Sequence, residues 1–149
     1  IQDEQLEIKE LFTEELLLAL PPGHPLARKR AASLTDLAGE KLIVMKEGHC
    51  LGDQVLGFCD RRDAKPIISF RSAQLETVQA LVTTGLGISL IPAMAVTGRR
   101  PKGPEYRPFQ SPQPQRKIVA AWPRQRPPGR AAVAFLKQIS GRLVSAGRK

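Results

Sequence analysis

Short apolar runs alternate with segments of helical periodicity along this chain of 149 residues. Each run is bounded by glycine, proline or charged residues, which is typical of a buried strand that ends in a turn. The predicted strands are Leu16–Leu20, Lys41–Met45, Ile67–Phe70, Gly87–Pro92 and Ile118–Trp122.

Helices are expected between and after these strands. Ser33 and Asp36 have the Ser-x-x-Asp spacing of a capping box, and Ser72 is suited to cap the helix whose apolar face begins at Leu75. The predicted helices run from Ser33 to Gly39, from about Leu51 to Asp60, from Ser72 to Gly85 and onward from Gly129.

Alternation of strands and helices predicts an α/β fold with a largely parallel sheet. The long connection over residues 97–117 is rich in glycine, proline and arginine at its start, and an irregular loop is expected there.

Composition points to a soluble cytoplasmic protein. Apolar residues make up 42% of the chain, and no apolar run approaches the roughly 18 residues that a membrane span needs. The first residues do not resemble a signal peptide, and only two cysteines occur, so a reducing compartment is expected. The absence of an initiator methionine suggests a fragment.

The net charge of +9 raises the expectation of an acidic partner. The basic residues are scattered in short groups, however, and no basic amphipathic helix, zinc finger or RNA-binding aromatic motif is present. A solvated basic surface is therefore favoured over a nucleic-acid site in this segment.

The two cysteines are the candidate chemistry. Cys50 follows His49 and precedes the predicted helix, and both a helix N-terminus and a protonated imidazole would favour the thiolate, which is the form that reacts with peroxides. The alternative, a small inert cysteine, has equal weight on these grounds. Cys59 falls on the apolar face of the same helix, which favours a core cysteine.

A bond between these cysteines would change the shape of the protein. The nine intervening residue steps correspond to ~13.5 Å of helix. A disulfide requires Cα atoms within about 7 Å, so the helix would have to unwind.

Other chemistries are not supported. The Cys-x8-Cys spacing with His49 does not match a zinc site, so no metal is expected. The chain has no nucleotide-binding glycine loop and no nucleophile motif, so neither a cofactor nor an enzymatic activity is expected.

Several motifs carry a family resemblance. LLLALPPGHPL (Leu16–Leu26), SLTDLAGEKLIV (Ser33–Val44) and GLGISLIPAMAV (Gly85–Val96) resemble the effector-binding domain of LysR-type transcriptional regulators. EGHCLGDQVLGFC (Glu47–Cys59) and the segment Phe70–Thr77 are similar to the hydrogen-peroxide-responsive branch of that family.

This resemblance implies a periplasmic-binding-protein-like regulatory domain with two lobes, one complete and the other partly present. Residues 1–13 and 125–149 would be the remnant of the first lobe, and residues 14–124 would form the second lobe with the cysteines. The winged helix-turn-helix that binds DNA in this family would lie outside the chain.

The resemblance also implies residue roles. Cys50 would react with peroxide and Cys59 would resolve it as a Cys50–Cys59 disulfide, while His49, Asp53 and Arg116 would line the peroxide pocket. For Arg116, an exposed loop charge is an equally weighted alternative.

The implied partners are hydrogen peroxide, further copies of the chain, a thiol reductant such as glutaredoxin or thioredoxin, and, through the full-length protein, promoter DNA and RNA polymerase. Gly52 departs from the larger polar residue often found in the family, and it is expected to loosen the start of the helix. The alternatives are a LysR-type domain that binds a small organic effector with inert cysteines and, less favoured, a thiol peroxidase.

Overall fold

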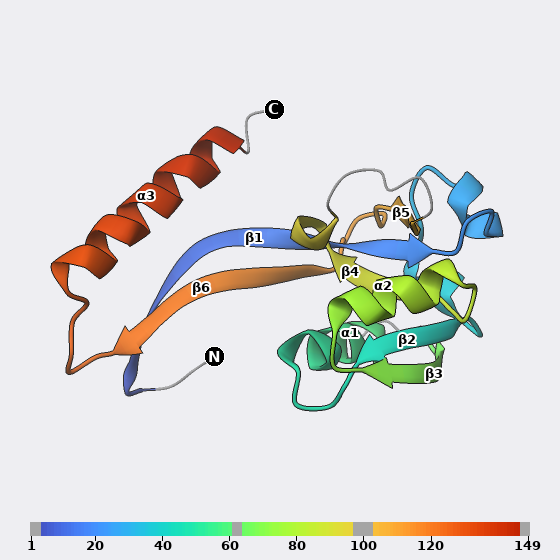
Figure 1. Ribbon diagram of the computed structural model, residues 1–149, viewed down its shortest axis with the longest axis horizontal. Coiled ribbons are helices and arrows are strands. Elements are labelled where there is room, and N and C mark those ends of the chain that lie inside the picture. The colour runs from blue at the N-terminus through green and yellow to red at the C-terminus, as the bar shows by residue number, and fades with distance from the viewer. Residues whose placement is uncertain (1–3, 61–63, 97–102, 147–149) are drawn as a thin grey trace. The chain divides into compact units, whose positions relative to one another are not determined.

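The computed structural model describes residues 4–60, 64–96 and 103–146, with side chains up to residue 139 (Figure 1). The strands are β1 (Leu6–Leu20), β2 (Lys41–Met45), β3 (Ile67–Ser72), β4 (Ser89–Pro92), β5 (Glu105–Arg107) and β6 (Gln115–Pro123). The α-helices are α1 (Cys50–Asp60), α2 (Leu75–Thr83) and α3 (Arg130–Ala146). Three short 3-10 helices are η1 (Pro25–Arg28), η2 (Leu34–Leu37) and η3 (Ala93–Ala95).

The chain divides into two compact units. The terminal unit consists of Ile1–Glu14 and Lys117–Lys149, and the sheet unit is Glu15–Arg116. In the terminal unit, β1 and β6 are joined by ion pairs between Lys117 and Glu10 at 2.8 Å and between Arg124 and Glu7 at 3.6 Å. The hydrogen bond from Lys117 lowers the pKa of the Glu10 carboxyl. In α3, Phe135 is 62% exposed.

The sheet unit is built outward from the apolar end of β1. Residues Leu16–Ala19 pair with β4, and residues Leu18–Leu20 pair with β5, both antiparallel. β2 and β3 pair in parallel, and a parallel bridge between Leu42 and Ile88 joins β2 to the segment that enters β4. The prediction of a largely parallel sheet is therefore wrong, because β1 pairs in the antiparallel sense with β4 and with β5.

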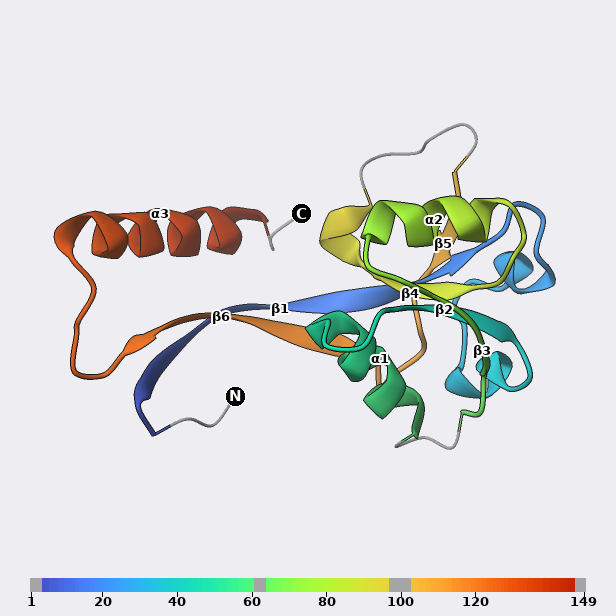
Figure 2. The same ribbon diagram turned by 60° about the horizontal axis from the view of Figure 1, so that its bottom comes forward.

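Helices α1 and α2 cover opposite sides of β2, as the two views in Figures 1 and 2 show. This arrangement follows from right-handed crossovers, because the chain moves outward from β2 to β3 through α1 and returns to β4 through α2. All of the strand residues Leu42–Met45 are buried, since both faces of β2 are covered.

The expected irregular loop over residues 97–117 is only partly irregular. Residues 97–102 lie outside the described part of the chain, but β5 and the start of β6 follow. Glu105 accepts a hydrogen bond from the Gly23 N–H at 2.9 Å, and the Arg107 Nε–H donates to the Ala27 carbonyl at 2.8 Å. These polar side chains tie β5 to the segment that follows β1. The segment is a strand because it pairs with Leu18–Leu20 of β1, a partner far away in sequence.

Ser72 does not cap α2 as predicted. The cap is Gln74, and the Ser72 hydroxyl instead bonds to the backbone of Gln74, which immediately precedes the helix. The predicted end of this helix at Gly85 is confirmed, and that glycine has a φ of +84°.

Gly87, just before β4, allows the backbone to approach β2 closely. A Cβ atom at this position would overlap the backbone oxygen of Lys41. Two backbone hydrogen bonds of 2.8 Å lie next to this approach. The Ile88 N–H donates to the Lys41 carbonyl, and the Ile43 N–H donates to the Ile88 carbonyl.

We expect Gly87→Ala to lower the free energy of unfolding by about 1–3 kcal/mol, because a backbone atom cannot yield as a side chain can. Urea denaturation followed by circular dichroism measures this loss. Gly129→Ala is the control, since a Cβ atom there meets open space, and a change above about 0.5 kcal/mol is not expected. Equal stability of the Gly87→Ala and parent chains would contradict the close contact.

Candidate redox site

Cys50 is the first residue of α1, and its side chain is exposed with a free thiol. A tight turn precedes it, in which the His49 N–H donates to the Lys46 carbonyl at 3.1 Å and Gly48 has a φ of +78°. The His49 carbonyl then accepts the Gly52 N–H at 2.8 Å as the first bond of the helix. Cys50 therefore lies at the end of α1 that carries partial positive charge.

The His49 side chain serves the same helix end. Its Nδ1 accepts a hydrogen bond from the Leu51 N–H at 3.3 Å, so the imidazole caps a backbone donor in the turn that carries Cys50. Asp53 lies exposed in this first turn, where its own N–H approaches the His49 carbonyl at 3.4 Å. These two predicted pocket residues thus share one turn with Cys50.

Cys59 lies one residue from the end of α1 and is only 2% exposed. Burial raises the pKa of its thiol to about 11, and the charge of Asp60 acts in the same direction. This thiol is protonated at neutral pH. The prediction that Cys59 is a core cysteine is confirmed.

The helix between the two cysteines is continuous, and both cysteines are free thiols. Nine helical steps place their Cα atoms ~13.5 Å apart, about twice the limit for a disulfide. In this conformation the two thiols cannot bond, and a Cys50–Cys59 disulfide requires α1 to unwind.

Gly52 has a packing role in addition to the loosening predicted for it. It is buried, and a Cβ atom there would lie 2.7 Å from the backbone oxygen of Met45, the last residue of β2. The absence of a side chain lets the first turn of α1 pack directly against the end of this strand. Gly52 lowers helix propensity, but it also permits the close packing.

Arg116 is half-buried in β6, at the last position of the sheet unit. Its contribution to a peroxide pocket stays a prediction. Within the described residues, no cluster of three or more His, Cys, Asp or Glu side chains is arranged to hold a metal ion. No helix in the described part of the chain is long and apolar enough to cross a membrane.

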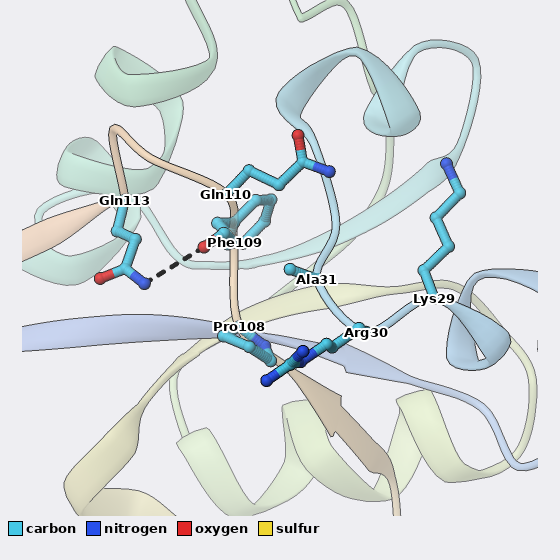
Figure 3. A pocket seen from close by; sticks show the side chains of 7 residues that line it. All are labelled: Lys29, Arg30, Ala31, Pro108, Phe109, Gln110 and Gln113. Atoms are coloured by element: carbon cyan, nitrogen blue, oxygen red, sulfur yellow. Dashed lines mark hydrogen bonds between the residues drawn. The ribbon is translucent and has the colours of Figure 1, made fainter.

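An open groove of about 630 Å³ in the sheet unit was not foreseen from the sequence (Figure 3). Two segments far apart in sequence form it, residues 29–31 and residues 108–113, and they are joined by a parallel bridge between Ala32 and Phe109. No local pattern indicates such a bridge. The groove is lined by Lys29, Arg30, Ala31, Pro108, Phe109, Gln110 and Gln113.

The family model of the LysR substrate binding domain matches residues 1–143. The chain belongs to this family. Its fold is the mixed α/β fold of LysR-type regulatory domains, which have the two-lobed, periplasmic-binding-protein-like architecture.

Several curated relatives are named hydrogen peroxide-inducible genes activators, among them proteins of Pectobacterium carotovorum and Dickeya chrysanthemi. The chain is 44% identical over 109 residues to the DNA-binding transcriptional dual regulator OxyR of Escherichia coli K12, an alignment that covers 72% of this chain and 36% of the relative. The chain therefore spans about a third of the length of the curated relatives it matches.

Two solved structures of OxyR distinguish the redox forms. The reduced form is 36% identical and superposes with a TM-score of 0.80, covering 94% of this chain and 66% of that one. The oxidised form is 38% identical with a TM-score of 0.69, covering 96% and 64%. The greater similarity to the reduced form agrees with the unbroken α1 and the free cysteines.

The burial difference between the cysteines predicts selective labelling. With iodoacetamide at pH 7.5, we expect Cys50 to be alkylated at least tenfold faster than Cys59, because Cys59 is both buried and protonated. Peptide mass spectrometry measures the two rates. In 8 M urea the rates should become equal, and equal rates in the folded protein would contradict the described placement of Cys59.

Proposed function

We propose that this chain is the hydrogen-peroxide-sensing part of the regulatory domain of a LysR-type transcriptional regulator. One observation carries the proposal: a single helix presents an exposed cysteine at its first turn and buries a second cysteine near its end. The names of the curated relatives and the motif Glu47–Cys59 support the same reading.

The chemistry takes place in two steps. The Cys50 thiolate attacks one peroxide oxygen, so that an S–O bond forms, the O–O bond breaks and hydroxide leaves to become water. The Cys59 sulfur then attacks the Cys50 sulfenic acid, so that the S–S bond forms and the S–O bond breaks with release of a second water. Overall, two thiols and one peroxide give one disulfide and two waters.

The second step is coupled to a change of shape. Cys59 must leave the core, and α1 must open, before the sulfurs can meet. Gly52 and Gly57 lie inside this helix of 11 residues, and each costs about 1 kcal/mol of intrinsic helix stability relative to alanine. The disulfide thus selects a second conformation, and the switch has two states.

His49, Asp53 and Arg116 are proposed to line the peroxide site. The position of His49 and Asp53 in the turn of Cys50 supports this for those two residues. A guanidinium close to Cys50 would stabilise its thiolate, which is the role proposed for Arg116. Residues 14–124 are assigned to the second lobe, and residues 1–13 and 125–149 to the first.

The proposed partners follow from the regulator as a whole. They are further copies of the chain, promoter DNA and RNA polymerase through the full-length protein, and a glutaredoxin or thioredoxin that restores the thiols in the bacterial cytoplasm. Contact between copies is supported by strand β3, where Ile67, Ile68 and Phe70 are 59%, 40% and 44% exposed. Clusters of exposed apolar side chains are typical of interaction surfaces.

The redox proposal predicts the products of oxidation. With one equivalent of hydrogen peroxide, we expect the chain to lose two mass units through a Cys50–Cys59 disulfide and to lose helical circular dichroism. Cys59→Ser should stop at a sulfenic acid that dimedone traps, and Cys50→Ser should form neither product. Peptide mass spectrometry identifies each species.

Persistence of two free thiols in the folded, treated chain would contradict the proposal. Catalytic consumption of many equivalents of peroxide with a thiol reductant would instead indicate a peroxidase. Binding of a small organic effector that is equally strong in a Cys50→Ser, Cys59→Ser variant would indicate a ligand-responsive regulator with inert cysteines.

The exposed face of β3 predicts self-association. We expect the chain to form dimers in multi-angle light scattering and the double variant Ile67→Lys, Phe70→Lys to weaken them by at least tenfold, since charge on an apolar interface is costly. Phe135→Lys on α3 is the matched control, because Phe135 is also exposed but belongs to the terminal unit. An unchanged dimer in the double variant would exclude β3 from the interface.

A further inference from the structure

The release of Cys59 from the core depends on what holds the end of α1 in place. Phe58 precedes Cys59 and is half-buried. Its ring meets that of Phe109 edge to face, with centroids 6.4 Å apart and the planes at 75°. This is the favoured geometry for an aromatic pair, and it adds to the stabilisation from burial alone.

Phe109 is fixed independently of the helix. It is 2% exposed, and its neighbours are bonded to Ala32, which donates its N–H to the Pro108 carbonyl at 2.9 Å and accepts the Gln110 N–H at 2.8 Å. The Gln113 amide also donates to the Phe109 carbonyl at 3.2 Å, the dashed bond in Figure 3. Phe109 is therefore part of the scaffold on which α1 rests.

The contact lies at one end of the helix only. Cys50 is exposed at the first turn, whereas Phe58 and Cys59 belong to the last turn. A change at Phe109 can therefore alter the release of Cys59 while the surroundings of Cys50 stay as they are. It also leaves the helix propensity of α1 unchanged, because Phe109 follows β5 in sequence.

We propose that Phe109 is a positioning residue of the redox switch, a latch that holds the last turn of α1 and sets how readily Cys59 reaches Cys50. This inference rests on the proposed function for its role in oxidation. Opening of the latch separates Phe58 from Phe109, and Cys59 becomes accessible before any bond between the cysteines forms.

The first experiment measures the latch without peroxide. In a Cys50→Ser chain, the alkylation rate of Cys59 by iodoacetamide at pH 8.5 reports the opening of the last turn. We expect Phe109→Leu to raise this rate about two- to tenfold, as loss of an edge-to-face contact implies. Phe58→Leu should do the same, and the double variant should add little, because both changes remove one contact.

Two controls distinguish the effect of the Phe58–Phe109 contact from a loss of global stability. Phe135→Leu removes an exposed ring in the terminal unit and should leave the Cys59 rate unchanged. Val78→Ala truncates a buried side chain in α2 and reports the effect of lost global stability, measured for every variant by urea denaturation. If Val78→Ala accelerates labelling as much as Phe109→Leu at equal loss of stability, or if Phe109→Leu has no effect, the latch is refuted.

The second experiment follows oxidation step by step. In a Cys59→Ser chain, Phe109→Leu should leave the rate of sulfenic acid formation within twofold of its parent. With both cysteines present, it should speed the conversion of sulfenic acid to disulfide about two- to tenfold. Equal acceleration of both steps would refute the latch. A parent chain that forms no disulfide would refute the proposed function, while the labelling result still decides whether Phe109 holds the helix.

Discussion

The packing of one short helix against one short strand is the constraint on which the proposed redox chemistry depends. Helix α1 separates the cysteines as long as it stays wound, and burial of Leu51, Val55 and Cys59 in the core keeps it wound. An isolated helix of 11 residues with two glycines is not stable in water, so tertiary contacts decide whether it exists. The same contacts therefore decide whether the thiols remain apart.

The energetic scale of the switch is small for the same reason. The close approach of Gly52 to β2 and the ring pair of Phe58 and Phe109 stabilise opposite ends of α1. Neither contact is large by itself, and a covalent bond between the cysteines outweighs both. Under the proposed function, the marginal stability of this helix would let a single equivalent of oxidant select a different fold of the segment.

Local patterns in the sequence predicted the elements that are determined by neighbouring residues. The limits of β2 and the extent of α1 were correct, because apolar runs and helical periodicity mark them directly. The direction of pairing around β1 was not predicted, since it depends on partners such as β5 that lie some 85 residues away in sequence. Around the cysteines, the burial of Cys59 could be predicted, because Cys59 falls on the apolar face of the helix. The contacts made by Gly52 and Phe109 were not, because they exist only once the chain is folded.

Strand β2 has a further consequence for how this protein can vary. A glycine stands against the backbone oxygen at each of its ends, Gly87 at Lys41 and Gly52 at Met45. Every other residue type would add atoms where oxygen already lies. In a saturation library, Gly87 should therefore tolerate almost nothing, although it carries no functional group, whereas Gly52 should tolerate more, because a larger polar residue often occupies its position in the family. A residue with no side chain would then rank beside the cysteines in mutational sensitivity, and a search for functional groups alone would overlook it.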